Sequence, residues 1–158
     1  MMMRVIRHVL AAAALLGAAF VVPTAANAAD KVCKLAITGN DLMQYDKKEL
    51  DVAADCTSVE LTLTHSGKLP KEAMGHNWVL VNTPDLSAVA NAGMSAGIAS
   101  NYVDKSDKKV LASTKVVGGG ETATVTFPTS ILKQGGAYSY LCTYPGHNSV
   151  MRGVLKFG

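Results

Sequence analysis

Residues 138–151 read YSYLCTYPGHNSVM, and this stretch carries both a strand pattern and the most unusual chemistry of the chain. Tyr138, Tyr140 and Cys142 alternate with residues of a second face, as they do in a β-strand. The pair Pro145-Gly146 then forces a turn that a helix could not accommodate. The segment therefore predicts a strand that ends at Cys142, followed by a short loop that carries an imidazole and a thioether.

The same alternation recurs along the chain and predicts an all-β fold. Val59, Leu61, Leu63 and His65 share one face of a segment, while residues 78–81 form the continuous apolar run of a strand buried on both sides. The predicted strands lie at residues 33–37, 59–65, 78–81, 122–127, 138–142 and 153–157. Repeated short strands of this kind are typical of a Greek-key β-sandwich or barrel, here in a single domain.

One stretch breaks the strand pattern and predicts a short helix outside the barrel. Residues 83–85 read Thr-Pro-Asp, which offers a capping hydroxyl, a proline at the first helical position and an acid in the first turn. Leu86, Val89, Ala90 and Met94 would then share one helical face. Two glycines in this stretch weaken the helix, so we expect it to be short.

The first 28 residues have the pattern of a cleaved export signal. Arg4 and Arg7 precede an uncharged apolar run at residues 9–22, and small residues follow at Ala26 and Ala28. The run is shorter than the roughly 20 residues that a membrane span needs, so an uncleaved anchor is the weaker alternative. We expect cleavage after Ala28 or Ala29, which would leave a periplasmic domain at residues 29–158 without a membrane anchor.

Composition and charge exclude several classes of protein. The chain has 158 residues, of which 49% are hydrophobic and 17% charged, so intrinsic disorder is excluded. Its net charge of +3 falls to +1 when Arg4 and Arg7 leave with the signal. A balance this close to neutral gives no support to nucleic-acid binding.

The three cysteines divide into a pair and a remainder. Export leads to an oxidising compartment in which disulfides persist, and an odd count leaves at least one thiol unpaired. A bridge between Cys33 and Cys56 would close one loop and leave Cys142 free, whereas two free thiols are the alternative.

A free thiol beside a histidine and a methionine points to a metal site. Blue-copper sites combine two histidines and one cysteine with a weak axial methionine. Cys142, His76 and His147 would supply the strong ligands here and Met151 the axial one. A cysteine protease would also pair Cys with His, but neither an orienting third residue nor an oxyanion loop is evident.

With these residues identified, the chain resembles the azurins, small periplasmic type 1 blue-copper proteins of the cupredoxin family. The likeness covers nearly all of residues 29–158. Its motifs are GND at 39–41 followed by Met43, Leu69-Pro70, MGHNW at 74–78, CTYPGH at 142–147, and Met151. The spacing of the last three ligands is highly specific to azurins, although Tyr144 stands where these proteins usually have phenylalanine.

The resemblance implies roles for further residues. The carbonyl of Gly75 would be a weak second axial ligand, and the backbone amides of Asn77 and Tyr144 would donate hydrogen bonds to the sulfur of Cys142. The family disulfide corresponds to Cys33 and Cys56, and His65 to a histidine near the metal that modulates the site with pH without ligating it. An apolar docking patch around the exposed ring edge of His147 would comprise Met43, Leu69, Met74, Met94 and Pro145.

The function implied is single-electron transfer by one copper ion that cycles between Cu(II) and Cu(I). The expected partners are redox proteins such as c-type cytochromes, nitrite reductase or periplasmic dehydrogenases, met by a monomer. A copper enzyme would need further metal sites, for which His65 alone is left, so we expect no catalysis. A copper store or chaperone is the alternative, and Zn(II) could occupy the same ligands.

Overall fold

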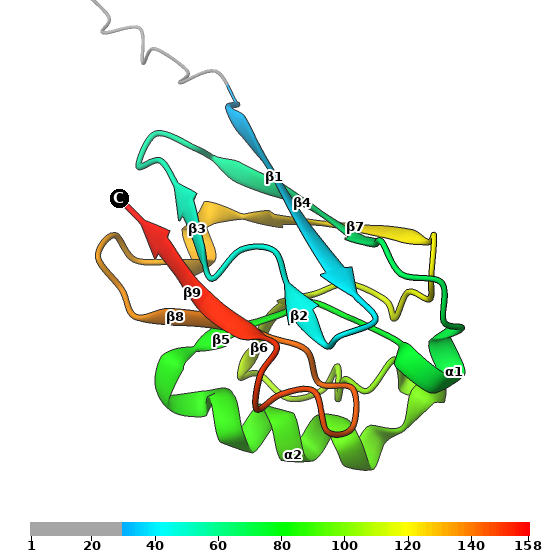
Figure 1. Ribbon diagram of the computed structural model, residues 1–158. Helices are drawn as coiled ribbons and strands as arrows, with labels where there is room; N and C mark the ends of the chain where they lie inside the picture. The colour runs from blue at the N-terminus through cyan, green and yellow to red at the C-terminus, as the bar shows by residue number, and fades with distance from the viewer. Residues whose placement is uncertain (1–29) are drawn as a thin grey trace, which may run out of the picture.

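The computed structural model describes residues 30–158, which form two β-sheets packed face to face with helices outside them (Figure 1). One sheet has the strand order β2-β1-β4-β7 and the other β3-β9-β8-β5-β6. The first contains β1 (Val32–Asn40), β2 (Gln44–Tyr45), β4 (Ser58–His65) and β7 (Thr122–Pro128). The second contains β3 (Glu49–Val52), β5 (Val79–Asn82), β6 (Val110–Ser113), β8 (Tyr138–Leu141) and β9 (Arg152–Phe157). The prediction of an all-β sandwich with a helix outside it is confirmed.

Parallel pairing of β1 with β4 determines which residues meet at each end of the first sheet. Val32 pairs with Ser58 at one end, and Gly39 pairs with His65 at the other. The alternating apolar residues of β4 are all buried, as their period of two predicts, whereas the opposite face carries threonines. Two of these threonine pairs, Thr62 with Thr124 and Thr64 with Thr122, lie within hydrogen-bond distance across β4 and β7.

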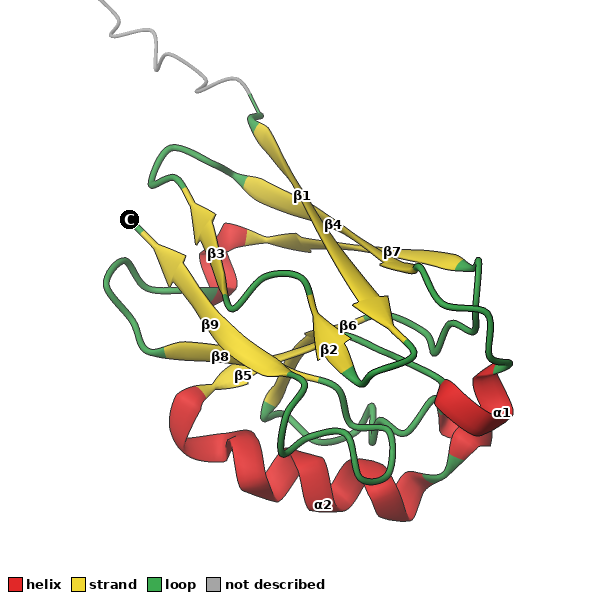
Figure 2. Ribbon diagram, viewed as in Figure 1, coloured by secondary structure: helices red, strands yellow, loops and turns green. Residues whose placement is uncertain are grey.

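The second sheet is covered on both faces, which explains the continuous apolar run in β5. Trp78 and Leu80 belong to the core between the two sheets, while Val79 and Val81 belong to a second cluster beneath a helix. That helix, α2 (Leu86–Ala96), runs along the outside of the second sheet (Figure 2). In a strand that is buried on both faces, apolar residues occupy consecutive positions and do not alternate with polar ones.

Two details of the predicted helix are wrong. Thr83 does not cap α2: it begins a 3-10 turn, η1 (Thr83–Asp85), and its hydroxyl pairs with that of Ser139 at 3.0 Å. Met94 is exposed, and the buried position on this face belongs to Gly93. A Cβ on Gly93 would stand 2.4 Å from the carbonyl oxygen of Tyr102 and 2.9 Å from Cβ of Thr143, so only glycine fits there.

Several short elements have no clear signal in the sequence. These are the strands β2, β3 and β6, the single-turn helix α1 (Lys71–Met74) and the 3-10 turns η2 (Ile98–Ser100) and η3 (Thr129–Ile131). Each strand among them has four residues or fewer, too few to show a period. Their positions follow from pairing with longer strands rather than from local pattern.

The two ends of the sandwich differ. Cys33 and Cys56 form a disulfide at the end where β1 begins, which confirms the predicted pair. Figure 1 shows the turn after β1, α1 and the loop between β8 and β9 at the opposite end. The predicted export signal, residues 1–28, lies outside the described residues. Within residues 30–158, no helix has the length and apolar character needed to cross a membrane.

Candidate metal centre

Three side chains from two distant segments meet at the end of the sandwich opposite the disulfide. His76, Cys142 and His147 are buried, and each directs a ligand atom to a common point, with these atoms all within 4.8 Å of one another. Nδ1 of His76 lies 3.2 Å from Nδ1 of His147, which in turn lies 3.7 Å from Sγ of Cys142. The structure thus brings together the three strong ligands predicted from the sequence.

His76 is fixed in orientation by its second ring nitrogen. Nε2 lies 2.8 Å from the carbonyl oxygen of Asn40, which can only accept, so the proton is assigned to Nε2 and Nδ1 keeps a free lone pair. The glycine before Asn40 makes room for this ring, because a Cβ on Gly39 would stand 2.7 Å from His76 Cδ2. The end of β1 therefore aims Nδ1 of His76 into the site.

Backbone hydrogen bonds close the ligand loop on itself. The amide of Cys142 donates to the carbonyl of Met151 at 2.9 Å, and the amide of Met151 donates to the carbonyl of His147 at 2.8 Å. A further bond of 3.0 Å joins the amide of His147 to the carbonyl of Tyr144. The three predicted ligands of this loop are thereby held in one small hydrogen-bonded ring of backbone.

The thiol of Cys142 is fully buried and has two backbone donors. Burial raises its pKa to about 12, while hydrogen bonds from the backbone of Asn77 and Tyr144 act in the opposite direction. Donors of this kind stabilise negative charge on sulfur. A nearby cation is therefore needed to ionise this thiol at neutral pH, and the two amides are in place to support the thiolate once it forms.

Both histidines of the site are neutral at pH 7. Burial lowers the pKa of His147 to about 4, with further lowering from His76 and His65. Burial also lowers the pKa of His76, against a hydrogen bond to Asn40 that raises it. Neutral imidazoles can donate a lone pair to a metal without first losing a proton.

The residues of the two predicted axial groups are neighbours of His76. Met151 is fully buried, and its methyl carbon lies 3.3 Å from the place that a Cβ on Gly39 would take, beside His76. Gly75 directly precedes His76 and is tightly packed, since a Cβ there would stand 2.5 Å from the carbonyl oxygen of Lys71.

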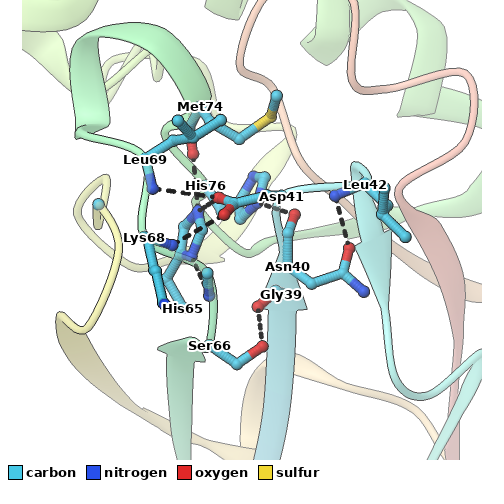
Figure 3. Close-up of polar contacts among 12 residues, drawn as sticks. Gly39, Asn40, Asp41, Leu42, His65, Ser66, Lys68, Leu69, Met74 and His76 are labelled. Carbon is cyan, nitrogen blue, oxygen red and sulfur yellow. Dashed lines mark hydrogen bonds and ion pairs between the residues drawn. The ribbon is translucent and has the colours of Figure 1, made fainter.

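His65 is next to the site but offers no free nitrogen to a metal. Its ring stacks on that of His76 with centroids 4.3 Å apart. Nδ1 accepts a bond from the amide of Gly67 at 2.9 Å, and Nε2 lies 2.9 Å from the carbonyl of Met74, to which it donates (Figure 3). With both nitrogens engaged, His65 is a neighbour of the site rather than a ligand.

Comparisons with known proteins agree with this geometry. Residues 31–158 match the model of a family described as copper binding proteins, plastocyanin/azurin family. The chain belongs to this family. It is 52% identical over 124 residues to Azurin-1 of Alcaligenes xylosoxydans xylosoxydans, covering 78% of this chain and 96% of that protein. It is 48% identical over 126 residues to the azurin of Alcaligenes faecalis, covering 80% and 98%.

A solved structure shows the same likeness in three dimensions. The azurin Az-iso2 from the obligate methylotroph Methylomonas sp. strain J superimposes with a TM-score of 0.77 at 43% identity, over 80% of this chain and 98% of that one. Membership of the plastocyanin/azurin family identifies copper as the cofactor. The donor set fits this ion, because thiolate and imidazole are ligands that copper binds strongly.

The docking patch that the sequence predicts for this chain is partly exposed. Leu69 and Met94 each expose 41% of their surface, Pro145 is exposed, and Met43 and Met74 are half-buried. His147 itself exposes only 3%, less than the prediction of an exposed ring edge suggested. Apolar side chains, and not the imidazole, therefore provide most of the accessible surface there.

Sequence reasoning missed the residues that hold this patch together. The carboxylate of Asp41 accepts hydrogen bonds from the amides of Lys68 and Leu69, at 2.8 and 3.3 Å (Figure 3). The side chain of Asn40 accepts bonds from the amides of Leu42 and Gln44 and so shapes the turn that carries Met43. In the sequence, only their membership of the GND motif at residues 39–41 drew attention to Asn40 and Asp41.

Sequence reasoning also missed a hydrogen-bond network that joins Asn77 to Thr143, the residue after Cys142. The amide side chain of Asn77 donates to the hydroxyl of Thr143 and to the carbonyl of Asn101, and it accepts a bond from the amide of Thr143. Asn101 and Tyr102 both have positive φ, 57° and 52°, which is uncommon for residues other than glycine. The carbonyl of Tyr102 accepts a bond from the hydroxyl of Thr143, so this unusual turn faces the ligand loop.

Proposed function

We propose that this chain is an electron carrier that takes up and releases single electrons at a type 1 copper site and passes them between redox proteins. Its ligands would be Nδ1 of His76, Sγ of Cys142 and Nδ1 of His147, with Met151 as the weak axial ligand. The carbonyl of Gly75 would be a second weak axial contact. The observation that carries the proposal is the convergence of two neutral imidazoles and one thiol at a buried point.

The chemistry supplied by the bound ion is a reversible one-electron change between Cu(II) and Cu(I). The chain's own residues keep their geometry through that change. Hydrogen bonds fix His76 through Asn40, and the backbone ring at residues 142–151 fixes the other ligands. A site whose ligands need not move when charge changes offers a small reorganisation barrier to electron transfer.

Electrons would enter and leave through the apolar surface that covers His147. The patch of Met43, Leu69, Met74, Met94 and Pro145 contains exposed apolar residues, which often mark an interaction site. Redox proteins meet through small, short-lived interfaces, so a limited patch is enough. The partners we propose are c-type cytochromes, nitrite reductase or periplasmic dehydrogenases, each met by a monomer of this chain in the periplasm.

In this proposal the chain is a carrier and not an enzyme. Turnover would need a place for substrate beside the metal, and the three strong ligands are enclosed by protein.

His65 acts as a modulator: a proton gained at Nδ1 would break its bond with Gly67 beside the stacked His76. An NMR titration of His65 between about pH 5 and 8 tests that role, and the absence of ionisation there would remove it.

Copper storage or delivery is the second candidate, and one observation weighs against it. A store that releases its metal needs an open or mobile site, whereas both ligand segments here are held by backbone bonds. The two functions also differ in the oxidation state they require. A store would hold Cu(I) alone, whereas a carrier must be stable with Cu(II) as well.

An absorption spectrum of the Cu(II)-loaded protein tests the proposal. An intense blue band is expected from the bond between copper and the sulfur of Cys142. The band should disappear on addition of one electron per protein, return on reoxidation, and be absent in Cys142→Ser. A colourless protein that accepts only Cu(I) or Zn(II) would favour storage or a redox-silent role.

A further inference from the structure

Tyr144 lies between the two segments that carry the proposed ligands. Its ring is buried, with the ring of Tyr102 at a centroid distance of 4.9 Å on one side and that of His147 at 4.7 Å on another. The planes of Tyr144 and Tyr102 meet at 68°, an edge-to-face arrangement that aromatic rings favour. These contacts fix where the ring points.

The hydroxyl of Tyr144 reaches across to the other segment. It donates a hydrogen bond of 2.6 Å to the carbonyl oxygen of Glu72, 72 residues earlier in the chain. Glu72 belongs to the single-turn helix α1, and the carbonyls of a last helical turn lack partners within the helix. The tyrosine therefore satisfies an acceptor that would otherwise have to find water.

Helix α1 leads directly into Gly75 and His76. A Cβ on Gly75 would stand 2.8 Å from Cε2 of Tyr144 and 2.6 Å from a methyl group of Val116. The aromatic ring thus packs against the backbone of Gly75 with no side chain between them. The ring of Tyr144 is therefore in close contact with the residue that precedes His76.

The same residue also contacts the sulfur ligand. Its backbone amide is one of the two groups that hydrogen-bond to the thiol of Cys142. Tyr144 accordingly touches both imidazole segments and the thiol through three different parts: hydroxyl, ring and amide. A phenylalanine would keep the ring and the amide and lose only the hydroxyl.

We propose that the hydroxyl of Tyr144 is a positioning group that locks α1 and the ligand loop together, so that the spacing between His76 and His147 is set before metal binds. This inference rests on the proposed ligand set for its consequence at copper. Its structural part, the lock between Glu72 and Tyr144, does not depend on copper at all.

Tyr144→Phe tests the lock, and Tyr140→Phe is a matched control. The hydroxyl of Tyr140 also donates to a backbone carbonyl, that of Lys47 at 2.8 Å, but Lys47 lies in a segment without a proposed ligand. Both variants lose one hydroxyl-to-carbonyl bond and keep the aromatic ring. A difference between them therefore reports on position rather than on the loss of a buried bond.

The first measurement is amide hydrogen exchange in the metal-free protein. The reporters are the amides of Met74 and His147, which bond to the carbonyls of Pro70 and Tyr144 on either side of the lock. In Tyr144→Phe both should exchange about fivefold faster, the size expected for one lost hydrogen bond. In Tyr140→Phe both should keep the wild-type rate.

The second measurement uses the copper-loaded protein. Tyr144→Phe should release copper about fivefold faster to a chelator and shift the copper hyperfine splitting in electron paramagnetic resonance, while Tyr140→Phe leaves both unchanged. Equal behaviour of the two variants, or unchanged exchange at either reporter amide in Tyr144→Phe, would overturn the lock. If wild-type protein gave no type 1 copper signal, the proposed function would fail, and the metal-free exchange would still decide the lock.

Discussion

The two ends of this sandwich use cysteine in opposite ways. At one end Cys33 and Cys56 are joined covalently, beside an exposed ion pair between Lys31 and Asp55. At the other end Cys142 stays a buried thiol. There the chain is held by hydrogen bonds and close packing instead of a covalent bond. One end is therefore stabilised by a covalent bond, whereas the other holds a free thiol in a defined geometry.

Electrostatics follows the same division. The carboxyl of Asp55 has a pKa below its usual value because Lys31 donates a hydrogen bond to it in the open. At the metal end, burial moves every relevant pKa toward the neutral form of the group, in His76, Cys142 and His147 alike. A site of neutral ligands has little charge of its own, so a bound cation dominates its electrostatics.

The largest effect on stability is expected at the disulfide end. Replacing Cys33 and Cys56 together by alanine should lower the free energy of unfolding by about 3 kcal/mol, because the unfolded chain is released from a closed loop. The blue band of the copper-loaded protein should keep its position and intensity. Denaturant unfolding and absorption spectra measure the two effects, and a change of colour would show that the ends are coupled.

The next effect is expected from filling the space beside His76. Gly39→Ala places a methyl group 2.7 Å from Cδ2 of an imidazole that is already fixed by Asn40 and His65. Overpacking of this kind should cost about 1–3 kcal/mol of stability in the metal-free protein and shift the spectrum of the copper form.

Thr38→Ala is the control for that substitution, because Thr38 precedes Gly39 and its side chain lies on the opposite face of β1. It should leave the copper spectrum unchanged. A Gly39→Ala protein with wild-type stability and colour would contradict the close fit described for this end of the sandwich.

Copper binding should depend on pH at the metal end through one proton. The pKa of Cys142 is about 12 and that of His147 about 4, so at pH 7 the thiol holds a proton and the imidazole does not. Metal binding then releases one proton, and the affinity should rise about tenfold per pH unit between pH 7 and 9. In free energy this is about 1.4 kcal/mol per pH unit.

Competition titrations with a chelator of known affinity measure that slope. A slope of two protons near neutral pH would mean that a histidine is also charged, contrary to the burial described above. The stability of the metal-free fold in acid depends on pH with the same sign. Because folding lowers the pKa values of His76 and His147, stability is lost as the pH falls from 6.5 toward 4.

The smallest effect is expected from a surface charge. Met74→Lys should slow electron exchange between two copies of the protein about tenfold, because two like charges would meet in the encounter. The blue colour should remain, since the thioether is not a proposed ligand. Val32→Lys is the counterpart at the disulfide end, where Val32 is also an apolar surface residue. If both substitutions slow the exchange equally, the docking patch is not at the metal end.

The sequence predicted the parts of this molecule in which local pattern and chemistry agree. Period-two alternation located β1, β4, β7 and β8, and the motif from Cys142 to His147 predicted two of the three side chains that meet at the candidate metal centre. Buried β5 was recognised by its continuous apolar run. In these segments the residues adjacent in sequence are enough to predict the secondary structure.

Other parts depend on contacts that no local pattern records. Thr83 looks like a helix cap, but a hydroxyl on a neighbouring strand takes its bond. Asn101 and Tyr102 adopt positive φ without glycine, held there by bonds to Asn77 and Thr143. The bond from Tyr144 to Glu72 joins residues 72 positions apart. Each of these is decided by tertiary structure, which outweighs local preference.

Electron self-exchange is the most direct test of the claim that the metal end transfers single electrons. A mixture of oxidised and reduced copper-loaded protein is examined by NMR as a function of the oxidised fraction. We expect resonances that broaden and average as electrons pass between molecules, with the rate lowered in Met74→Lys and kept in Val32→Lys. Two separate and unbroadened sets of resonances would contradict it, since a site that holds copper without exchanging electrons belongs to a store.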